Sequence, residues 1–176
     1  MDDLIATSQA LLATTPERWE RLVEASTSEL LRRAPAPGEW SALECLGHLV
    51  DTEEQAFPVR VEAFLAGRDF AAFDPDESGT RVGPETDGVV LARRFAEARR
   101  RSLALLRRIG QADLGRRARH PELGEVRLDE LLHEWVGHDL MHTVQAERAL
   151  LQPFIVGSGP WRGLFVAHDV EASATG

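Results

Sequence analysis

The segment HEWVGHDLMH, residues 133–142, holds three of the six histidines in a chain of 176 residues. His138 and His142 are four residues apart, so on a helix their side chains lie on one face, with Cβ atoms about 5–6 Å apart. Two imidazoles in this arrangement can bind one divalent ion, because Zn–N bonds are about 2.0–2.1 Å long. His133 falls on the opposite side of such a helix, where we expect it to be solvated.

A metal site needs at least a third ligand, which a facing helix supplies in a helical bundle. His48 is the candidate, at the edge of the apolar stripe in EWSALECLGHLVDTEEQAF. Asp51 and Glu54 follow it closely and could be a fourth ligand, a partner for an imidazole N–H, or surface charge. The alternative is that the histidines are core residues, each with its ring N–H bonded to a neighbour.

Three further residues lie near the candidate ligands on the same predicted helices. Trp135 belongs to the apolar stripe of its helix and is a candidate pocket wall, and Asp139 leans toward the same side. Cys45 precedes His48 by one turn, and a lone cysteine among leucines is typical of a small core residue. A soft metal ligand or a redox-sensitive thiol is the alternative for Cys45.

Four segments with helical period must position these residues, and strands are nearly absent, so the sequence predicts an all-α fold. Ser41 and Glu44 form a capping-box pattern at the start of the helix that carries His48. A long loop, residues 67–88, follows that helix, and residues 120–126, HPELGEV, are typical of a tight turn or a short irregular hairpin. The predicted helices cover residues 15–33 (starting at Thr15-Pro16, with a shorter piece at about 3–13 before it), 41–66, 87–109 and 128–151.

The chain length and composition favour a single domain over residues 1–176, with a short helical extension at about 1–14 and an irregular tail at about 152–176. A chain of this length buries a core without a structural metal. One cysteine and no secretory signal or membrane-length apolar run indicate a cytoplasmic protein that does not enter the membrane. The net charge of −9 disfavours nucleic acid as a partner. Only the arginines of residues 93–108 suggest a surface that binds nucleic acid. The alternative, which we favour, is that they form the solvated face of a helix.

Three stretches together resemble one family: PAPGEWSALECLGHLVDTEE (35–54), HPELGEVRLDELLHEWVGHDLMHTVQAERAL (120–150) and, more faintly, GPWR (159–162). The combination of W-S-x-x-E-x-x-x-H with a distant H-D-x-x-H is similar to the DinB-like proteins, metal-dependent four-helix bundles of the YfiT type that are related to bacillithiol- and mycothiol-dependent S-transferases. The resemblance implies a four-helix bundle with a long loop after the second helix. It also implies a metal held by His48, His138 and His142.

The resemblance implies fold and metal more strongly than reaction. We expect a metal-dependent enzyme of bacterial type with Zn²⁺ or Ni²⁺, since imidazole ligands suit both ions. Its reaction is transfer to or from a low-molecular-weight thiol, or hydrolysis, on a small-molecule substrate. The alternative is a non-catalytic bundle that binds a metal or a partner. Homodimerisation is a further expectation, because related bundles pair through helix faces.

Overall fold

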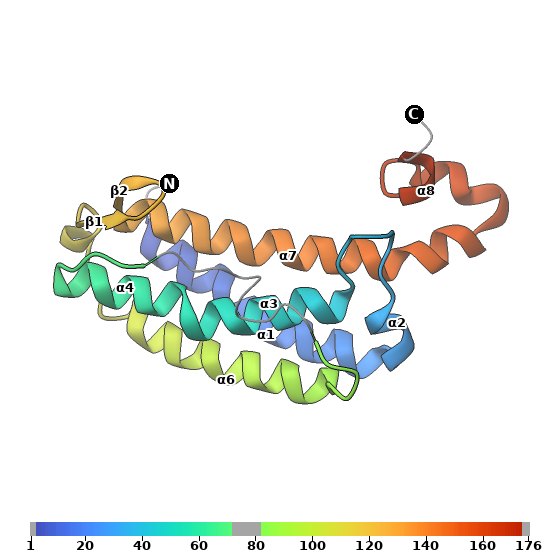
Figure 1. Ribbon diagram of the computed structural model, residues 1–176, viewed down its shortest axis with the longest axis horizontal. Helices are drawn as coiled ribbons and strands as arrows, with labels where there is room; N and C mark the ends of the chain where they lie inside the picture. The colour runs from blue at the N-terminus through green and yellow to red at the C-terminus, as the bar shows by residue number, and fades with distance from the viewer. Residues whose placement is uncertain (1–2, 72–81, 174–176) are drawn as a thin grey trace.

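The structure, a computed structural model, describes residues 3–71 and 82–173. Long helices lie alongside one another in an all-α four-helix bundle (Figure 1). The described elements are, in chain order, α1 (Leu4–Ala25), α2 (Ser28–Arg32), α3 (Ala42–Gln55), α4 (Phe57–Ala66), α6 (Gly88–Leu106), the 3-10 helix η1 (Gln111–Asp113), β1 (Arg117–His120), β2 (Gly124–Arg127), α7 (Leu128–Gly157), the 3-10 helix η2 (Gly159–Phe165) and α8 (Val170–Ser173).

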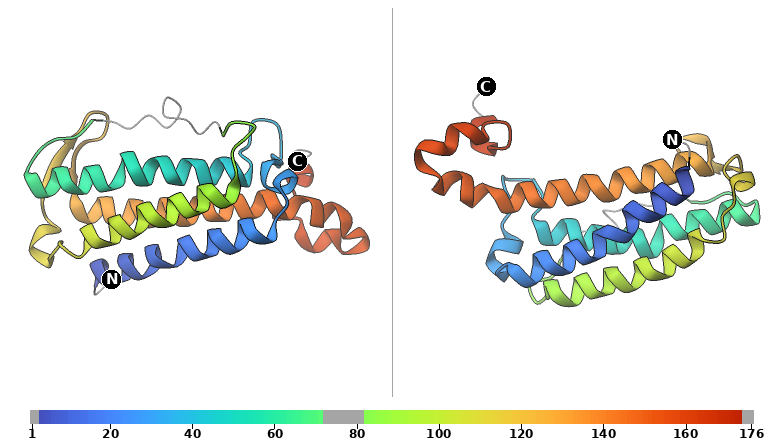
Figure 2. Two further views of the ribbon diagram at one scale, coloured as in Figure 1. Left: turned by 90° about the horizontal axis from the view of Figure 1, so that it is seen from below. Right: turned by 180° about the vertical axis from the view of Figure 1, so that it is seen from behind.

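Each helix of the bundle packs against two others. α1 contacts α6 and α7, and α3 contacts the same two helices, so the order around the bundle is α1, α6, α3, α7 (Figure 2). α4 continues α3 and also packs on α7. One face of α3 therefore packs on α6 and another on α7. Each side chain of α3 can contact only the helix that its face meets.

The predicted second helix begins and ends as expected but is interrupted. The Ser41 hydroxyl accepts from the Glu44 backbone N–H, and the Glu44 carboxylate accepts from the Ser41 N–H, which confirms the capping box. Gly67 ends α4 in the left-handed conformation at φ 64°. Between them the helix breaks at Ala56, because Pro58 has no N–H to donate to the carbonyl of Glu54 one turn earlier.

The prediction that a helix begins at Thr15-Pro16 is wrong, because α1 is continuous from Leu4 and Pro16 lies inside it. A proline inside a helix leaves the carbonyl four residues earlier without its N–H partner. Here that carbonyl belongs to Leu12, and it accepts from the Thr15 hydroxyl at 3.1 Å and from Arg99 Nη1 at 2.8 Å. A tertiary contact from α6 thus replaces the missing helical hydrogen bond.

The second half of the chain follows the prediction except at its end. α6 begins at the N-cap Asp87, and β1 and β2 form a regular antiparallel hairpin, with Arg117 opposite Arg127. α7 runs to Gly157 and η2 and α8 follow it, so the expected irregular tail from residue 152 is wrong for the described residues. Of the expected loop at 67–88, residues 72–81 lie outside the described residues. Val82, at its return, packs on α3 beside Gly47.

The core consists of two hydrophobic clusters along the bundle axis. The cluster at the hairpin end includes Leu12, Phe57, Phe64, Leu106, Leu128, Leu132 and Trp135. The cluster at the other end includes Trp19, Leu43, Leu46, Leu49, Phe95, Ala146 and Leu150. Arg99 lies between them, with its guanidinium 4.8 Å from the Phe95 ring and 5.8 Å from the Trp135 ring.

Candidate metal centre

The three candidate ligands lie together between α3 and α7. His48 Nε2 is 2.9 Å from His138 Nε2, and the ring centroids of the three histidines are 4.5–4.9 Å apart. One ring nitrogen from each lies within 4.8 Å of the others. Ligands of one zinc ion lie within about 4 Å of each other, given Zn–N bonds of about 2.0–2.1 Å. Small ring rotations would therefore bring all three onto one ion.

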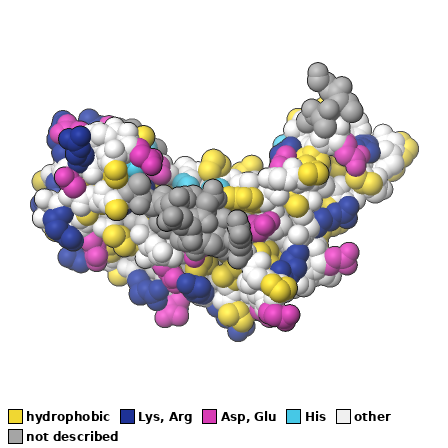
Figure 3. Space-filling view, viewed as in Figure 1, with side chains coloured by type: hydrophobic (Ala, Val, Ile, Leu, Met, Phe, Trp, Pro, Cys, Tyr) yellow, Lys and Arg dark blue, Asp and Glu magenta, His cyan; other side chains and the backbone are white. Residues whose placement is uncertain are grey.

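Local helix geometry explains this convergence. His138 and His142 are one turn apart on α7, and they face α3 at the level of His48. The capping box at Ser41 fixes the start of α3, and with it the rotation of His48 about the helix axis. Histidine side chains reach the surface beside α7, in the hollow between the hairpin end and the C-terminal end of the molecule (Figure 3).

The environment keeps the three imidazoles neutral. Burial first, and then the neighbouring histidines, lower the pKa of His48 to about 4 and that of His138 to about 3. Burial also lowers the pKa of His142, although Gln145 and Asp139 act in the opposite direction. Neutral imidazole is the form that binds a metal. At neutral pH the cluster is therefore ready to act as a ligand set without first losing protons.

Several ring nitrogens lack the partners that a buried polar group requires. The Nδ1 atoms of His48 and His138 have no hydrogen-bond partner in the part of the chain that the structure describes. Their Nε2 atoms face each other, and in two neutral rings at most one proton can lie between them. His142 Nδ1, by contrast, is 2.9 Å from Gln145 Oε1, which orients that ring. A cation bound by the two Nε2 atoms would replace that single shared proton and give both nitrogens a partner.

Two aromatic rings wall the cluster. Trp40, just before α3, stacks on His142 with ring centroids 5.5 Å apart and an interplanar angle of 17°, and it also contacts His48. Phe57 meets His138 edge-on at 5.1 Å. The sequence analysis did not assign Trp40 to the site. A signal was present, since an apolar residue directly before an N-cap commonly packs back on its helix.

Asp139 and Trp135 belong to a buried network behind the histidines, not to the ligand shell itself. Arg99 donates to both carboxylate oxygens of Glu53 at 2.8 and 2.9 Å, and to Asp139 Oδ1 at 2.6 Å. The Thr15 hydroxyl donates to Asp139, and Trp135 Nε1 donates to Glu53 at 3.3 Å. Side chains of all four bundle helices therefore meet at Arg99. The expectation that the arginines of residues 93–108 are all solvated is wrong at this position.

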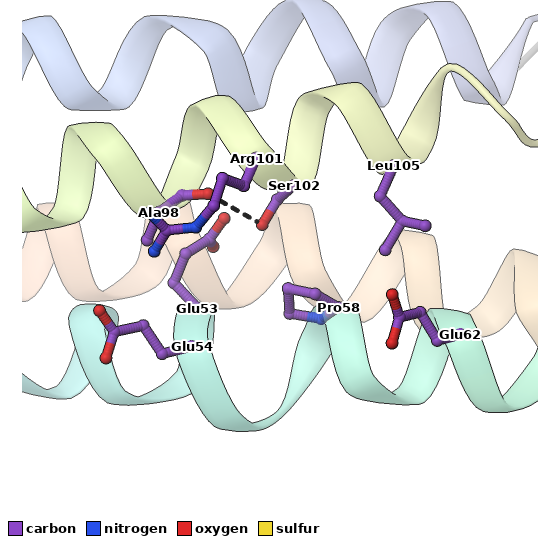
Figure 4. Close-up of a pocket in the computed structure, with 8 residues that line it drawn as sticks. All are labelled: Glu53, Glu54, Pro58, Glu62, Ala98, Arg101, Ser102 and Leu105. Carbon is purple, nitrogen blue, oxygen red and sulfur yellow. Dashed lines mark hydrogen bonds between the residues drawn. The ribbon is translucent and has the colours of Figure 1, made fainter.

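Glu54 and Asp51 lie on the α6 side of α3. Glu54 forms a bidentate pair with Arg94 at 2.5 and 3.0 Å. Burial raises the pKa of Asp51 to about 6, and its charged neighbours are Arg94 and Glu54. Glu54 also lines a pocket of about 440 Å³ between α3–α4 and α6, together with Pro58, Glu62, Arg101 and Leu105 (Figure 4). No hydrogen bond or ion pair among the described residues joins either acid to the histidines.

The remaining candidates are distributed as follows. His133 is exposed, as expected, and Cys45 is buried in the core, where burial raises the pKa of its thiol to about 12. Trp161, in the GPWR stretch, is 67% exposed on η2. His120 is buried at the end of β1, where its Nδ1 accepts from the backbone N–H groups of Glu122 and Leu123.

The fold and the cluster define an all-α bundle with three converging histidines, and comparison with known proteins places it in a family. The chain belongs to the DinB superfamily, whose family model matches residues 11–146. Two solved structures from Bacillus subtilis share its fold. YfiT, described as a probable metal-dependent hydrolase with an unusual four-helix bundle topology, has 19% identity and a TM-score of 0.73, over 82% of this chain and 85% of YfiT.

The second structure, the DinB-like protein YjoA, has 19% identity and a TM-score of 0.56, over 82% of this chain and 90% of YjoA. A search among curated proteins found no match. At these identities the likeness to the two structures concerns the fold. The chemistry of this chain has to be argued from its own side chains.

Proposed function

We propose that this protein is a divalent-metal-dependent enzyme whose ion, Zn²⁺ or Ni²⁺, is held by His48, His138 and His142. The observation that carries the proposal is the convergence of three neutral imidazoles from two helices, with His48 and His142 buried, His138 half-buried and ring nitrogens within 4.8 Å of one another. The family membership and the description of YfiT as a probable metal-dependent hydrolase support it.

The donor set fits a catalytic ion better than a structural one. Structural zinc sites are closed by four protein ligands, whereas catalytic sites have three and an open position. Among the described residues, no fourth histidine, cysteine or carboxylate joins the cluster. When bound, a divalent ion in such a site lowers the pKa of a water or a thiol and polarises the group to be attacked.

The residues around the cluster have roles of their own. Gln145 orients the His142 ring through Nδ1, and Trp40 and Phe57 limit the access of water from two sides. Arg99 holds Asp139, the neighbour of His138, and thereby fixes the rotation of α7. Hydrolysis is the first reaction to test, with transfer to a low-molecular-weight thiol as the alternative that the family resemblance implies.

The first experiment is elemental analysis of protein purified without an affinity tag or chelator. We expect about one equivalent of Zn or Ni in the wild type and little in His48→Ala and His142→Ala, with unchanged helical circular dichroism. His133→Ala is the matched control, because it removes an exposed histidine from the same helix and should retain the metal. Full metal content in either ligand variant, or metal-free wild type that binds no added ion, would refute the proposal and favour a non-catalytic partner-binding bundle.

The partners and the location stay proposals. We infer a cytoplasmic protein that acts on a small molecule. We infer that nucleic acid is not a partner, since the net charge is −9 and, among the arginines of residues 93–108, Arg94 and Arg101 pair with Glu54 and Glu97 while Arg99 is buried. None of the described helices is long and apolar enough to cross a membrane.

A further inference from the structure

A second hollow lies at the hairpin end of the bundle, between α4, the β-hairpin and α7. Its volume of about 300 Å³ is at the lower end of the range for small-molecule sites. We call it the Arg60 pocket. The residues that carry its chemistry are Arg60, Phe70, His120, Leu131 and Glu134.

Arg60 is a buried cation without adequate acceptors. Its side chain is only 12% exposed, and its Nε has no hydrogen-bond partner among the described residues. The carboxylate of Glu134 is 3.8 Å from Nη1, too far for a hydrogen bond, and the guanidinium lies 5.5 Å from the Phe70 ring centre. A guanidinium presents its N–H groups as a planar fork that matches a carboxylate. A carboxylate bound in the pocket would therefore give the guanidinium an acceptor closer than that of Glu134.

The rest of the pocket restricts which anion fits. Glu122, Glu130 and Glu134 add negative charge, which disfavours phosphates and dicarboxylates more than it does a monoanion. His120 Nδ1 accepts two backbone N–H groups, so in the neutral ring the proton is on Nε2, which adds a donor. Phe70 and Leu131 supply apolar wall. Together these features favour a monoanion with an apolar body.

The Arg60 pocket adjoins the histidine cluster. Glu134 lies one turn, about 5.4 Å, before His138 on α7. Arg60 lies close to one turn after Phe57 on α4, and the Phe57 ring contacts His138. The Arg60 pocket and the cluster are thus about one helical turn apart along both α4 and α7.

We propose that the Arg60 pocket binds the carboxylate end of a small monocarboxylate substrate, with the carboxylate on Arg60, the apolar part on Phe70 and Leu131, and the reacting group toward the three histidines. Binding of the carboxylate stands on the pocket alone, whereas its role as part of the substrate site rests on the proposed function. The substrate class is thus a small carboxylic acid, hydrolysed or transferred at a group a few bonds from the carboxylate.

The first test measures binding to the wild type by NMR titration with three probes of similar shape. Hydrocinnamate carries one negative charge, hydrocinnamide none and phenyl phosphate up to two. We expect hydrocinnamate to bind about 10- to 100-fold more tightly than the amide, the difference expected for hydrogen bonds to a charged group. Phenyl phosphate should also bind more weakly. Equal binding of acid and amide would overturn the proposal without any variant.

Substitutions then locate the binding. Arg60→Gln should weaken hydrocinnamate binding by at least about tenfold, whereas Glu134→Gln, which removes a like charge, should strengthen it. Arg108→Gln is the matched control, because Arg108 is an exposed arginine outside the pocket and should leave the affinity unchanged. Unchanged affinity in a folded Arg60→Gln protein would overturn the assignment of Arg60.

A paramagnetic ion connects the two sites. Co²⁺ bound at the histidines should broaden the signals of bound hydrocinnamate in the wild type and not in His142→Ala, which should still bind the acid. Binding without broadening in cobalt-loaded wild type would overturn the role as part of the substrate site. If the wild type binds no metal, the proposed function is refuted, and so is the role of the Arg60 pocket as part of the substrate site. Binding of the acid through Arg60 is then decided by the titration alone.

Discussion

Arg99→Met is the most informative test of the fold, because the side chain it removes joins all four helices. The guanidinium donates to Glu53, Asp139, the Leu12 carbonyl and the Thr15 hydroxyl, and it is 1% exposed. Methionine keeps much of the length but none of the donors, and so leaves two carboxylates in the core without their cation. Breaking a buried ion pair in this way costs about 3–5 kcal/mol. Against a total of about 5–15 kcal/mol for a domain, the loss is severe.

The measurement is urea unfolding followed by circular dichroism, with Arg94→Met as the matched control. Arg94 is on the same helix and pairs with Glu54, next to Glu53, but its side chain is 52% exposed. An exposed pair of this kind contributes about 0–1 kcal/mol. The triple variant Glu53→Gln, Arg99→Met, Asp139→Asn should recover part of the loss, since it removes the stranded charges. Similar losses in Arg99→Met and Arg94→Met would refute the idea that the buried network holds the bundle together.

Three further predictions concern protonation and assembly. The pKa of His48 is lowered from 6.5 to about 4, so the unfolded chain binds more protons between these values, and metal-free protein should lose stability as the pH falls from about 7 to 4. The slope should be smaller in His48→Leu, where His138 and His142 still contribute, and an unchanged slope would exclude the contribution of His48. Cys45, with its pKa raised to about 12 by burial, should resist iodoacetamide at pH 8 until the protein is unfolded, and rapid alkylation of folded protein would contradict the burial. We expect light scattering to give the mass of two chains, since the C-terminal end exposes Phe154, Trp161 and Leu164, and Trp161→Ser should shift the mass toward one chain; a monomeric wild type would contradict the expected homodimer.

Local signals in the sequence predicted the helices and their capped ends. The capping box at Ser41, the N-cap Asp87 and the left-handed Gly67 are each set by a few neighbouring residues. Pro16 misled for the opposite reason. The acceptor that it leaves unpaired is satisfied by Arg99, 87 residues away along the chain, and local propensity contains no information about such a partner.

The metal ligands of the candidate site could be predicted from the sequence, but the roles of the neighbouring acids could not. Spacing and family resemblance pointed to three histidines, and the structure brings them together. The roles of the acids were harder to predict, because carboxylates on the two sides of α3 cannot be distinguished in the sequence. Only the packing shows that Glu53 faces Arg99 and Glu54 faces Arg94. The buried arginine did leave a trace: Arg99 is four residues after Phe95 and three before Ser102, both buried, so it continues the inward stripe of α6.

The placement of the histidines on two helices links the stability of the folded protein to the binding of an ion. His48 and His138 are separated by 90 residues, so an ion bound by both acts as a reversible cross-link that closes a long loop of the chain. Ligands that bind only the folded state stabilise it by mass action, by about 2.7 kcal/mol at a hundred times the dissociation constant. Without the proposed ion the protein would unfold and be degraded more readily, so its abundance would follow the supply of that metal.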